Sequence, residues 1–121
     1  MGRIKTFAKS FYYAIRGLSY VLRNERNFQN EVGASIVVIV AMIYFKVTES
    51  EMIVLFLVIM GVLVMEIFNT VVERVVDMLK PRVHPYVKVI KDMMAASVLV
   101  TSLLALIIGI IIFTPHVMSK F

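Results

Sequence analysis

The chain has 121 residues, of which 60% are hydrophobic, and a formal net charge of +5. Its mean hydropathy of +0.90 is too high for an ordinary soluble domain, and its length is too short for a large transporter. Its basic residues flank apolar stretches rather than form one patch interleaved with aromatic residues, which argues against nucleic acid and favours anionic lipid headgroups or a polyphosphate ligand. These features predict a small integral membrane protein that forms one domain, residues 1–121.

The first predicted element is a surface helix over about residues 5–24. Its apolar residues recur at helical spacing on one side: Phe7, Phe11, Ile15, Leu18 and Leu22. Lysine and arginine residues fall on the other side, among them Lys5, Lys9 and Arg16. This pattern is typical of a basic amphipathic helix that lies in the membrane interface and does not cross the bilayer.

Three apolar stretches follow and predict three transmembrane helices. The first covers about residues 28–46, and its apolar part is short for a span of about 20 residues. The second covers about residues 51–72 and continues as a helix to residue 79. The third, residues 93–113, contains no charged residue and is the clearest span. Pro81 and Pro85 interrupt the helical pattern and predict a loop over residues 81–86, with helix resuming near Val87.

The distribution of lysine and arginine predicts the orientation of these spans. Of the 13 basic residues, only Lys46 and Lys120 lie on one side, and the others precede the first span or lie between the second and third. Cytoplasmic connections carry the excess of positive charge. We therefore expect the N-terminus and the connection between the second and third spans in the cytoplasm, with the C-terminus outside.

The second span carries a ladder of polar residues in an otherwise apolar helix. Its members are Glu66, Asn69, Thr70, Glu73 and Asp77. Their spacings of three, four, seven and eleven residues bring them onto neighbouring turns of one face. An ionisable group within a span costs roughly 2.5 to 3.5 kcal/mol on insertion scales, so the ladder indicates a function. The expected orientation places it at the cytoplasmic end, within reach of a cytosolic nucleotide.

Two non-catalytic functions are also consistent with such a ladder. A structural assembly subunit would use it for packing against neighbouring helices. A small proton-coupled transporter would also use an intramembrane glutamate, although near the midplane, and it would have no need of Lys91, Asp92 or Glu25. Replacing Glu66 or Glu73 with glutamine separates these alternatives from an enzyme.

The run from Glu66 to Asp77, Glu-Ile-Phe-Asn-Thr-Val-Val-Glu-Arg-Val-Val-Asp, resembles the signature of the prokaryotic diacylglycerol kinase family, which includes undecaprenol kinases. Other landmarks agree in order and spacing: Asn24-Glu25 with Phe28 and Glu31 before the first span, and Lys91-Asp92-Met93 with Ala95, Ala96, Ser97 and Val98 at the start of the third. The resemblance covers roughly residues 7–113.

The sequence departs from the family pattern at four positions. Phe68 and Val71 replace smaller residues, and Ser97 stands where alanine is usual, which concerns packing. Thr6 stands where some members carry a basic residue, and either Lys5 or Arg3 is the candidate to replace it. All the carboxylates of the signature are present.

The resemblance implies an all-α membrane protein with an N-terminal amphipathic surface helix and three transmembrane helices, assembled as a homotrimeric helical bundle with sites shared between subunits. It implies ATP-dependent phosphorylation of a membrane lipid alcohol in the bacterial cytoplasmic (inner) membrane. The acceptor is either diacylglycerol, giving phosphatidic acid, or undecaprenol, giving undecaprenyl phosphate. The residues leave this choice open.

The resemblance also assigns roles to individual residues. Glu25 and Glu73 look like ligands of Mg²⁺, an ion that prefers hard oxygen donors, and Glu66 resembles the general base. Asn69 orients the base or a metal-bound water, and Lys91 neutralises charge on the transferred phosphate. The residues expected near ATP are Tyr13, Arg82, His84 and Asp92. The five glycines fit no phosphate-binding loop, so side chains and metal must hold ATP. The roles of Asp77 and Glu31 stay open.

Overall fold

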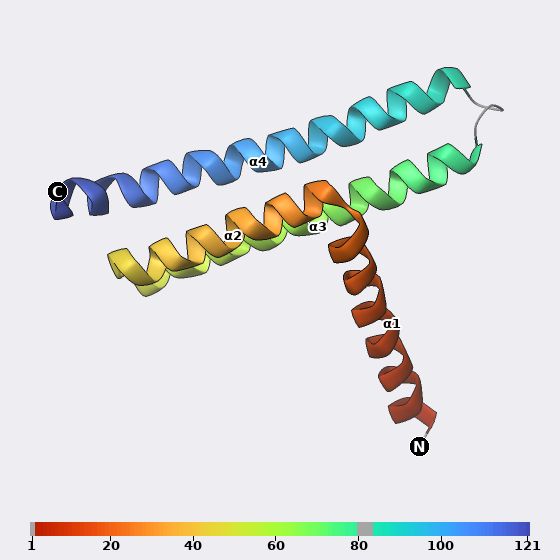
Figure 1. Cartoon of the computed structure of the whole chain (residues 1–121), viewed down its shortest axis with the longest axis horizontal. Helices are drawn as coiled ribbons and strands as arrows, with labels where there is room; N and C mark the ends of the chain where they lie inside the picture. Colours follow the sequence, from red (N-terminus) through yellow and green to blue (C-terminus); the bar gives the residue numbers. More distant parts are fainter. Residues whose placement is uncertain (1, 80–83) are drawn as a thin grey trace.

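The computed structural model describes residues 2–79 and 84–121, except for the side chain of His84. It contains four helices: α1 (Gly2–Asn24), α2 (Arg26–Phe45), α3 (Glu49–Leu79) and α4 (His84–Lys120). Helices α2, α3 and α4 run side by side as a long bundle, and α1 leaves it at a steep angle (Figure 1). The prediction of an all-helical chain is therefore confirmed.

Three of the helices, α2, α3 and α4, are long and apolar enough to cross a membrane, as expected. The first span is not short, because α2 begins at Arg26 and its polar first turns complete a helix of 20 residues. At 1.5 Å per residue its length is about 30 Å, the thickness of the hydrocarbon core. Polar residues that flank a short apolar stretch therefore belong to the span itself.

Helix α4 is longer than the apolar stretch predicted. It begins at His84 rather than near Val87, and it continues to Lys120. Pro85 lies in its first turn, where the missing N–H costs no intrahelical hydrogen bond. Pro115 lies inside the helix, and the helical path resumes after it. Pro85, which was expected to lie in the loop, is therefore part of the first turn of α4.

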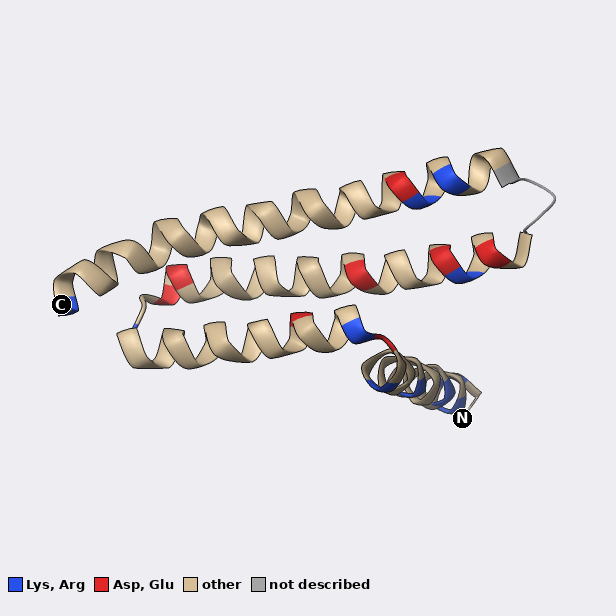
Figure 2. Ribbon diagram, turned by 45° about the horizontal axis from the view of Figure 1, so that its top comes forward, with Lys and Arg blue, Asp and Glu red and all other residues tan. Residues whose placement is uncertain are grey.

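Helix α1 stands apart from the bundle and buries only Val21. Its lysines and arginines are spread along its length, and no acidic residue accompanies them (Figure 2). Phe7 and Phe11 are exposed, at 73% and 61%. A helix of this kind, set at a steep angle to the spans, has the orientation that an interfacial helix needs. The hydroxyl of Thr6 donates to the carbonyl of Gly2 within the same helix, at 2.8 Å.

A tight turn joins α2 to α3. Lys46 adopts a left-handed backbone conformation with φ of 53°, which ends α2 and lets the chain reverse. Thr48 and Glu51 then form a reciprocal capping box, because Thr48 N–H donates to Glu51 Oε1 at 2.9 Å and Glu51 N–H donates to Thr48 Oγ1 at 3.2 Å. Two otherwise unpaired N–H groups at the start of α3 are satisfied in this way.

The best-packed part of the bundle lies beside this turn. Its buried cluster consists of Met42, Val47, Leu55 and Ile112, contributed by α2, the turn, α3 and α4. Phe113 packs against the cluster, and its ring lies 6.1 Å from that of Phe45. The three spans are therefore held together most firmly at the end where the C-terminus also lies (Figure 1).

Two polar contacts tie the end of α4 to the same region. His116 Nε2 and Glu51 Oε1 are hydrogen-bonded at 2.9 Å, and the ammonium group of Lys120 lies 4.1 Å from the centre of the Tyr44 ring. The His116 contact joins the last turns of α4 to the cap of α3. These contacts hold the helix segment that follows Pro115 in place.

Elsewhere the bundle exposes large apolar side chains. Leu57 of α3 is 68% exposed, and Val100 and Ile111 of α4 are 66% and 63% exposed. Faces of this kind are stable against lipid chains or against other copies of the chain. The exposed surface of the bundle is therefore that of a membrane protein.

Candidate functional site

The buried polar residues of the bundle are three neighbours on α3. Glu66 is 3% exposed, Thr70 5% and Asn69 8%, in a helix whose other buried residues are apolar. The hydroxyl of Thr70 donates to the carbonyl oxygen of Glu66 at 3.1 Å, which satisfies it within its own helix. Glu66 thus presents a carboxylate inside the bundle, where an unused charge would be costly.

Asn69 connects this buried region to the next turn of α3. Its Nδ2 donates to Glu73 Oε1 at 3.1 Å. We expected Asn69 to orient the base or a metal-bound water, whereas the contact that is present orients Glu73. The carboxylate of Glu73 therefore has a fixed direction before any ligand binds.

Glu66 lies in an electrostatic environment shaped by residues of α2 and of its start. Glu31, Glu73 and Glu25 are all near enough to interact with its carboxylate electrostatically. The side chain of Asn27 in α2 faces the same carboxylate within hydrogen-bonding reach. Four carboxylates from α2, α3 and the junction before α2 are thus gathered around one position.

Glu25 occupies the junction between α1 and α2. Its backbone is extended, with φ of −110° and ψ of 110°, and its carboxylate forms an ion pair with the guanidinium of Arg74. Arg74 directly follows Glu73 in α3, so the pair brings the two expected metal ligands to the same end of the bundle. This end carries most of the charged residues of the three spans (Figure 2).

The carboxylates of Glu25 and Glu73 fit a metal ion that takes only some of its ligands from the protein. Among the side chains that the structure describes, no group of three or more histidine, aspartate or glutamate residues is arranged to hold a metal ion. Mg²⁺ typically binds through one or two carboxylates and fills its other positions with phosphate oxygens and water. Glu25 and Glu73 are suited to that mode of binding and unsuited to a closed metal cage.

A second ion pair links α3 to α4 at the same end. Lys91 Nζ lies 2.6 Å from Asp77 Oδ1. This contact gives Asp77 a partner on the neighbouring helix, and it places Lys91 one turn beyond Glu73 along α3. The adjacent Asp92 is exposed on α4. Both residues lie at the end where nucleotide binding was expected.

Tyr13 of α1 lines a cavity of about 620 Å³ between α1 and α3. Tyr20 and Arg74 line the same cavity, which is otherwise largely apolar. Tyr13 thus shares this cavity with Arg74, the partner of Glu25. Arg82 and the side chain of His84, both expected near the nucleotide, lie outside the part of the chain that the structure describes.

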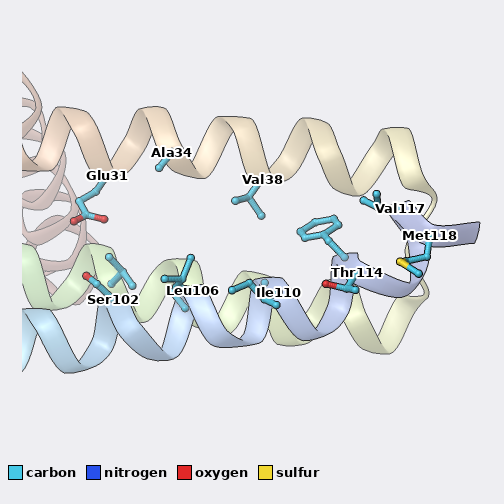
Figure 3. Close-up of a pocket in the computed structure, with 13 residues that line it drawn as sticks. Glu31, Ala34, Val38, Ser102, Leu106, Ile110, Thr114, Val117 and Met118 are labelled. Atoms are coloured by element: carbon cyan, nitrogen blue, oxygen red, sulfur yellow. The ribbon is translucent and has the colours of Figure 1, made fainter. Parts of the chain in front are cut away.

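A long apolar groove of about 600 Å³ runs between α2 and α4. Glu31 lies at one end, Val38 and Leu106 line the middle, and Val117 and Met118 lie at the other end (Figure 3). Glu31, at one end of the groove, also interacts electrostatically with the carboxylate of Glu66. The lining of the groove is thus largely apolar, with one carboxylate at an end.

Sequence reasoning assigned no role to three residues of this region: Arg74, Asn27 and the groove residue Glu31. Arg74 stands inside the signature run, but its partner Glu25 is 49 positions away. Only the packing of α3 against the junction before α2 reveals that contact. The polar first turns of α2 were the one available signal for Asn27 and Glu31.

Comparison with known proteins gives matches over nearly the whole chain. The family model described as prokaryotic diacylglycerol kinase matches residues 12–113. The undecaprenol kinase of Bacillus subtilis is 36% identical over 93% of this chain and 91% of its own length. The diacylglycerol kinase of Escherichia coli is 30% identical over 89% of this chain and 88% of its own length. The diacylglycerol kinase of Synechocystis is 32% identical over 91% of this chain and 63% of its own length.

Proposed function

Because this chain belongs to the prokaryotic diacylglycerol kinase family of membrane lipid kinases, we propose that it transfers the γ-phosphoryl group of Mg-ATP to the hydroxyl of a membrane lipid alcohol, with Glu66 as general base. The observation that carries this proposal is the burial of Glu66, 3% exposed, whose carboxylate interacts electrostatically with Glu31 of the apolar groove and with the carboxylates of Glu73 and Glu25. A lipid hydroxyl and a cytosolic phosphate meet only at such a position.

The charged residues have separate roles in binding the nucleotide. Glu25 and Glu73 would hold Mg²⁺, which supplies neutralisation of the phosphate oxygens when it is bound. Asn69 fixes the direction of Glu73 through their 3.1 Å hydrogen bond. Lys91 supplies a cation toward the transferred phosphate, and Tyr13 contacts the nucleotide from α1. Positioning and charge stabilisation of this kind account for most of the catalysis of phosphoryl transfer.

Glu66 supplies the remaining requirement, a proton acceptor. Its carboxylate takes the proton of the lipid hydroxyl while that oxygen forms a bond to the γ-phosphorus. The bond between the γ-phosphorus and the β–γ bridging oxygen breaks, and ADP leaves with the bridging oxygen. Asn27, within hydrogen-bonding reach of Glu66, helps to hold the carboxylate in position.

Undecaprenol is the acceptor that we favour. The identity to an undecaprenol kinase, 36%, exceeds the 30% and 32% to two diacylglycerol kinases. The groove between α2 and α4 offers one apolar path for one chain, as a polyprenol requires. Diacylglycerol is the second candidate, because proteins of that name match over similar lengths of this chain.

The charge bias and the shape of the bundle complete the proposal. The N-terminus and the connection between α3 and α4 lie in the cytoplasm of a bacterium, and the C-terminus lies outside. The exposed apolar faces of α3 and α4 pack against neighbouring copies in a homotrimer. This arrangement places Glu25, Glu73 and Lys91 on the side where ATP is present.

The test uses purified protein in lipid bilayers supplied with Mg-ATP and an equal mixture of diacylglycerol and undecaprenol. We expect phosphate transfer, mainly to undecaprenol, and its loss in Glu66→Gln. Glu49→Gln is the matched control, because Glu49 is an exposed glutamate at the opposite end of α3. If the wild-type protein phosphorylated neither lipid, the proposed function would be wrong.

The groove is tested by filling it. A Cβ added at Gly109, which lines the groove, meets no atom within 4 Å, so Gly109→Leu starts its side chain in open space and narrows the groove. We expect a higher KM for the lipid and an unchanged KM for ATP. Gly33→Leu in α2 is the control, because that position is equally open and does not line the groove. An equal effect of both substitutions would remove the groove from the proposal.

A further inference from the structure

Arg74 lies beside the proposed metal ligands, but the proposed function gives it no role. It follows Glu73 directly in α3, and its guanidinium contacts the carboxylate of Glu25 at the junction before α2. The Arg74 side chain is 56% exposed, whereas that of Glu25 is 20% exposed. A largely solvent-accessible cation therefore lies against one expected metal ligand and next to the other.

Arg74 also lines the cavity between α1 and α3. Arg74 and Tyr13 both line this cavity, and Tyr13 is a residue expected to contact the nucleotide. Arg74 also interacts electrostatically with Tyr20 and with Asp77, the partner of Lys91. Arg74 thus lines the cavity that contains Tyr13, and it also contacts Glu25, a carboxylate expected to bind the metal.

The ion pair itself does not explain why an arginine stands there. Exposed ion pairs of this kind contribute little to stability, because water screens them and two long side chains must be held in place. A guanidinium offers a planar set of donors that matches phosphate oxygens. If Glu25 held a metal ion, that ion would compensate its charge, and the Arg74 guanidinium would be available to another anion.

We propose that Arg74 is a nucleotide-binding residue that pairs with Glu25 in the free protein and exchanges it for a phosphate oxygen of bound Mg-nucleotide. This inference rests on the proposed function, since it concerns the same nucleotide site. In the free protein the pair keeps both groups near their binding positions. In the complex, Glu25 would bind the metal ion and Arg74 would donate hydrogen bonds to a phosphate oxygen.

Substitutions of Arg74 test the binding step. In full-length protein in lipid bilayers, Arg74→Gln should raise the KM for Mg-ATP roughly 10-fold or more, as expected for loss of a charged hydrogen bond. The KM for the lipid should stay unchanged, and Arg74→Lys should recover part of the loss. Lys88→Gln is the control, because Lys88 is an exposed cation in the first turns of α4. An unchanged KM for Mg-ATP in Arg74→Gln would overturn the inference.

Metal-free nucleotide tests the exchange itself. Because Glu25 competes with phosphate for Arg74, Glu25→Gln should bind ATP in the presence of a chelator more tightly than the wild-type protein does. The double variant Glu25→Gln with Arg74→Gln should lose this gain. If Glu25→Gln bound metal-free ATP no better than the wild type, the competition between Glu25 and phosphate would be refuted.

A thermal-shift measurement separates this inference from the proposed lipid kinase activity. A non-hydrolysable ATP analogue with Mg²⁺ should raise the unfolding temperature of the wild-type protein and not that of Arg74→Gln. This outcome supports the nucleotide contact even if neither lipid is phosphorylated. A purely structural ion pair would instead lower the unfolding temperature of the nucleotide-free variant and leave the shift intact, which would overturn the inference.

Discussion

Asn69 illustrates what a residue's spacing leaves undetermined. It stands three residues after Glu66 and four before Glu73, so either carboxylate is a neighbour on the helix surface. The side chain donates to Glu73, and Asn27 from α2 takes the position facing Glu66. The sequence predicted the polar face correctly, but the choice of partner depends on a rotamer and on a residue of another helix.

Removal of the Asn69 carboxamide should weaken magnesium use. In Asn69→Ala the carboxylate of Glu73 loses the donor that fixes its direction. Loss of an outer partner of a metal ligand typically costs about 10- to 100-fold in metal affinity or activity. The measurement is the initial rate of lipid phosphorylation as a function of free Mg²⁺ at saturating ATP.

Ser97→Ala is the control for this variant, because the Ser97 hydroxyl donates to the carbonyl of Met93 within its own helix at 3.2 Å. It should leave the magnesium dependence unchanged. A normal magnesium dependence in Asn69→Ala would show that Glu73 does not rely on this hydrogen bond.

Helix α3 is longer than a bilayer is thick. Its 31 residues extend about 46 Å, against a hydrocarbon core of about 30 Å. If the membrane begins near Met52, it ends about 20 residues later, close to Glu73. Glu66 then lies within the hydrocarbon region, and Asp77 lies beyond it. The length of the helix alone therefore places Glu66 and Asp77 at different depths, as the proposed meeting of a lipid hydroxyl with a cytosolic nucleotide requires.

The start of α3 depends on its capping box. Thr48→Ala removes the hydroxyl that accepts from Glu51 N–H, and loss of such a cap costs about 1 kcal/mol of stability. We expect a lower unfolding temperature in detergent micelles and unchanged turnover, because Glu66 lies about 27 Å away along the helix.

Ser50→Ala, in the same first turn, is the reference for this change and should have a smaller effect on the unfolding temperature. His116→Ala gives a further comparison, since His116 is hydrogen-bonded to the same cap through Glu51. Equal stability of Thr48→Ala and Ser50→Ala would indicate that the cap does not hold α3 in place.

At the scale of the whole molecule, the sequence predicted the features that depend on neighbouring residues and did not predict the contacts between distant ones. Apolar run length predicted three spans, and helical periodicity predicted the amphipathic α1, because both signals depend on neighbouring residues. The pairs Arg74 with Glu25, Lys91 with Asp77 and His116 with Glu51 were not predicted. Their members are 49, 14 and 65 positions apart, and their contact depends on how each helix is rotated against the next.

If the chain assembles as the proposed homotrimer, the ion pair between Arg74 and Glu25 predicts which chains supply the two proposed magnesium ligands. Since Glu25 pairs with the residue after Glu73 in the same chain, we expect one protomer to supply both magnesium ligands. A mixture of Glu25→Gln and Glu73→Gln chains, combined before assembly, should then stay as inactive as each variant alone. The rate of lipid phosphorylation is the measurement.

Two different affinity tags on the two variants, with purification through both tags in turn, show that mixed assemblies have formed before the rate is measured. If the two ligands came from neighbouring protomers, mixed trimers would contain intact sites and the mixture of variants would regain activity. Such a recovery would mean that the ion pair between Arg74 and Glu25 is replaced across the subunit boundary in the active assembly. Continued inactivity places both ligands in one protomer and leaves the neighbour to supply groups from other helices.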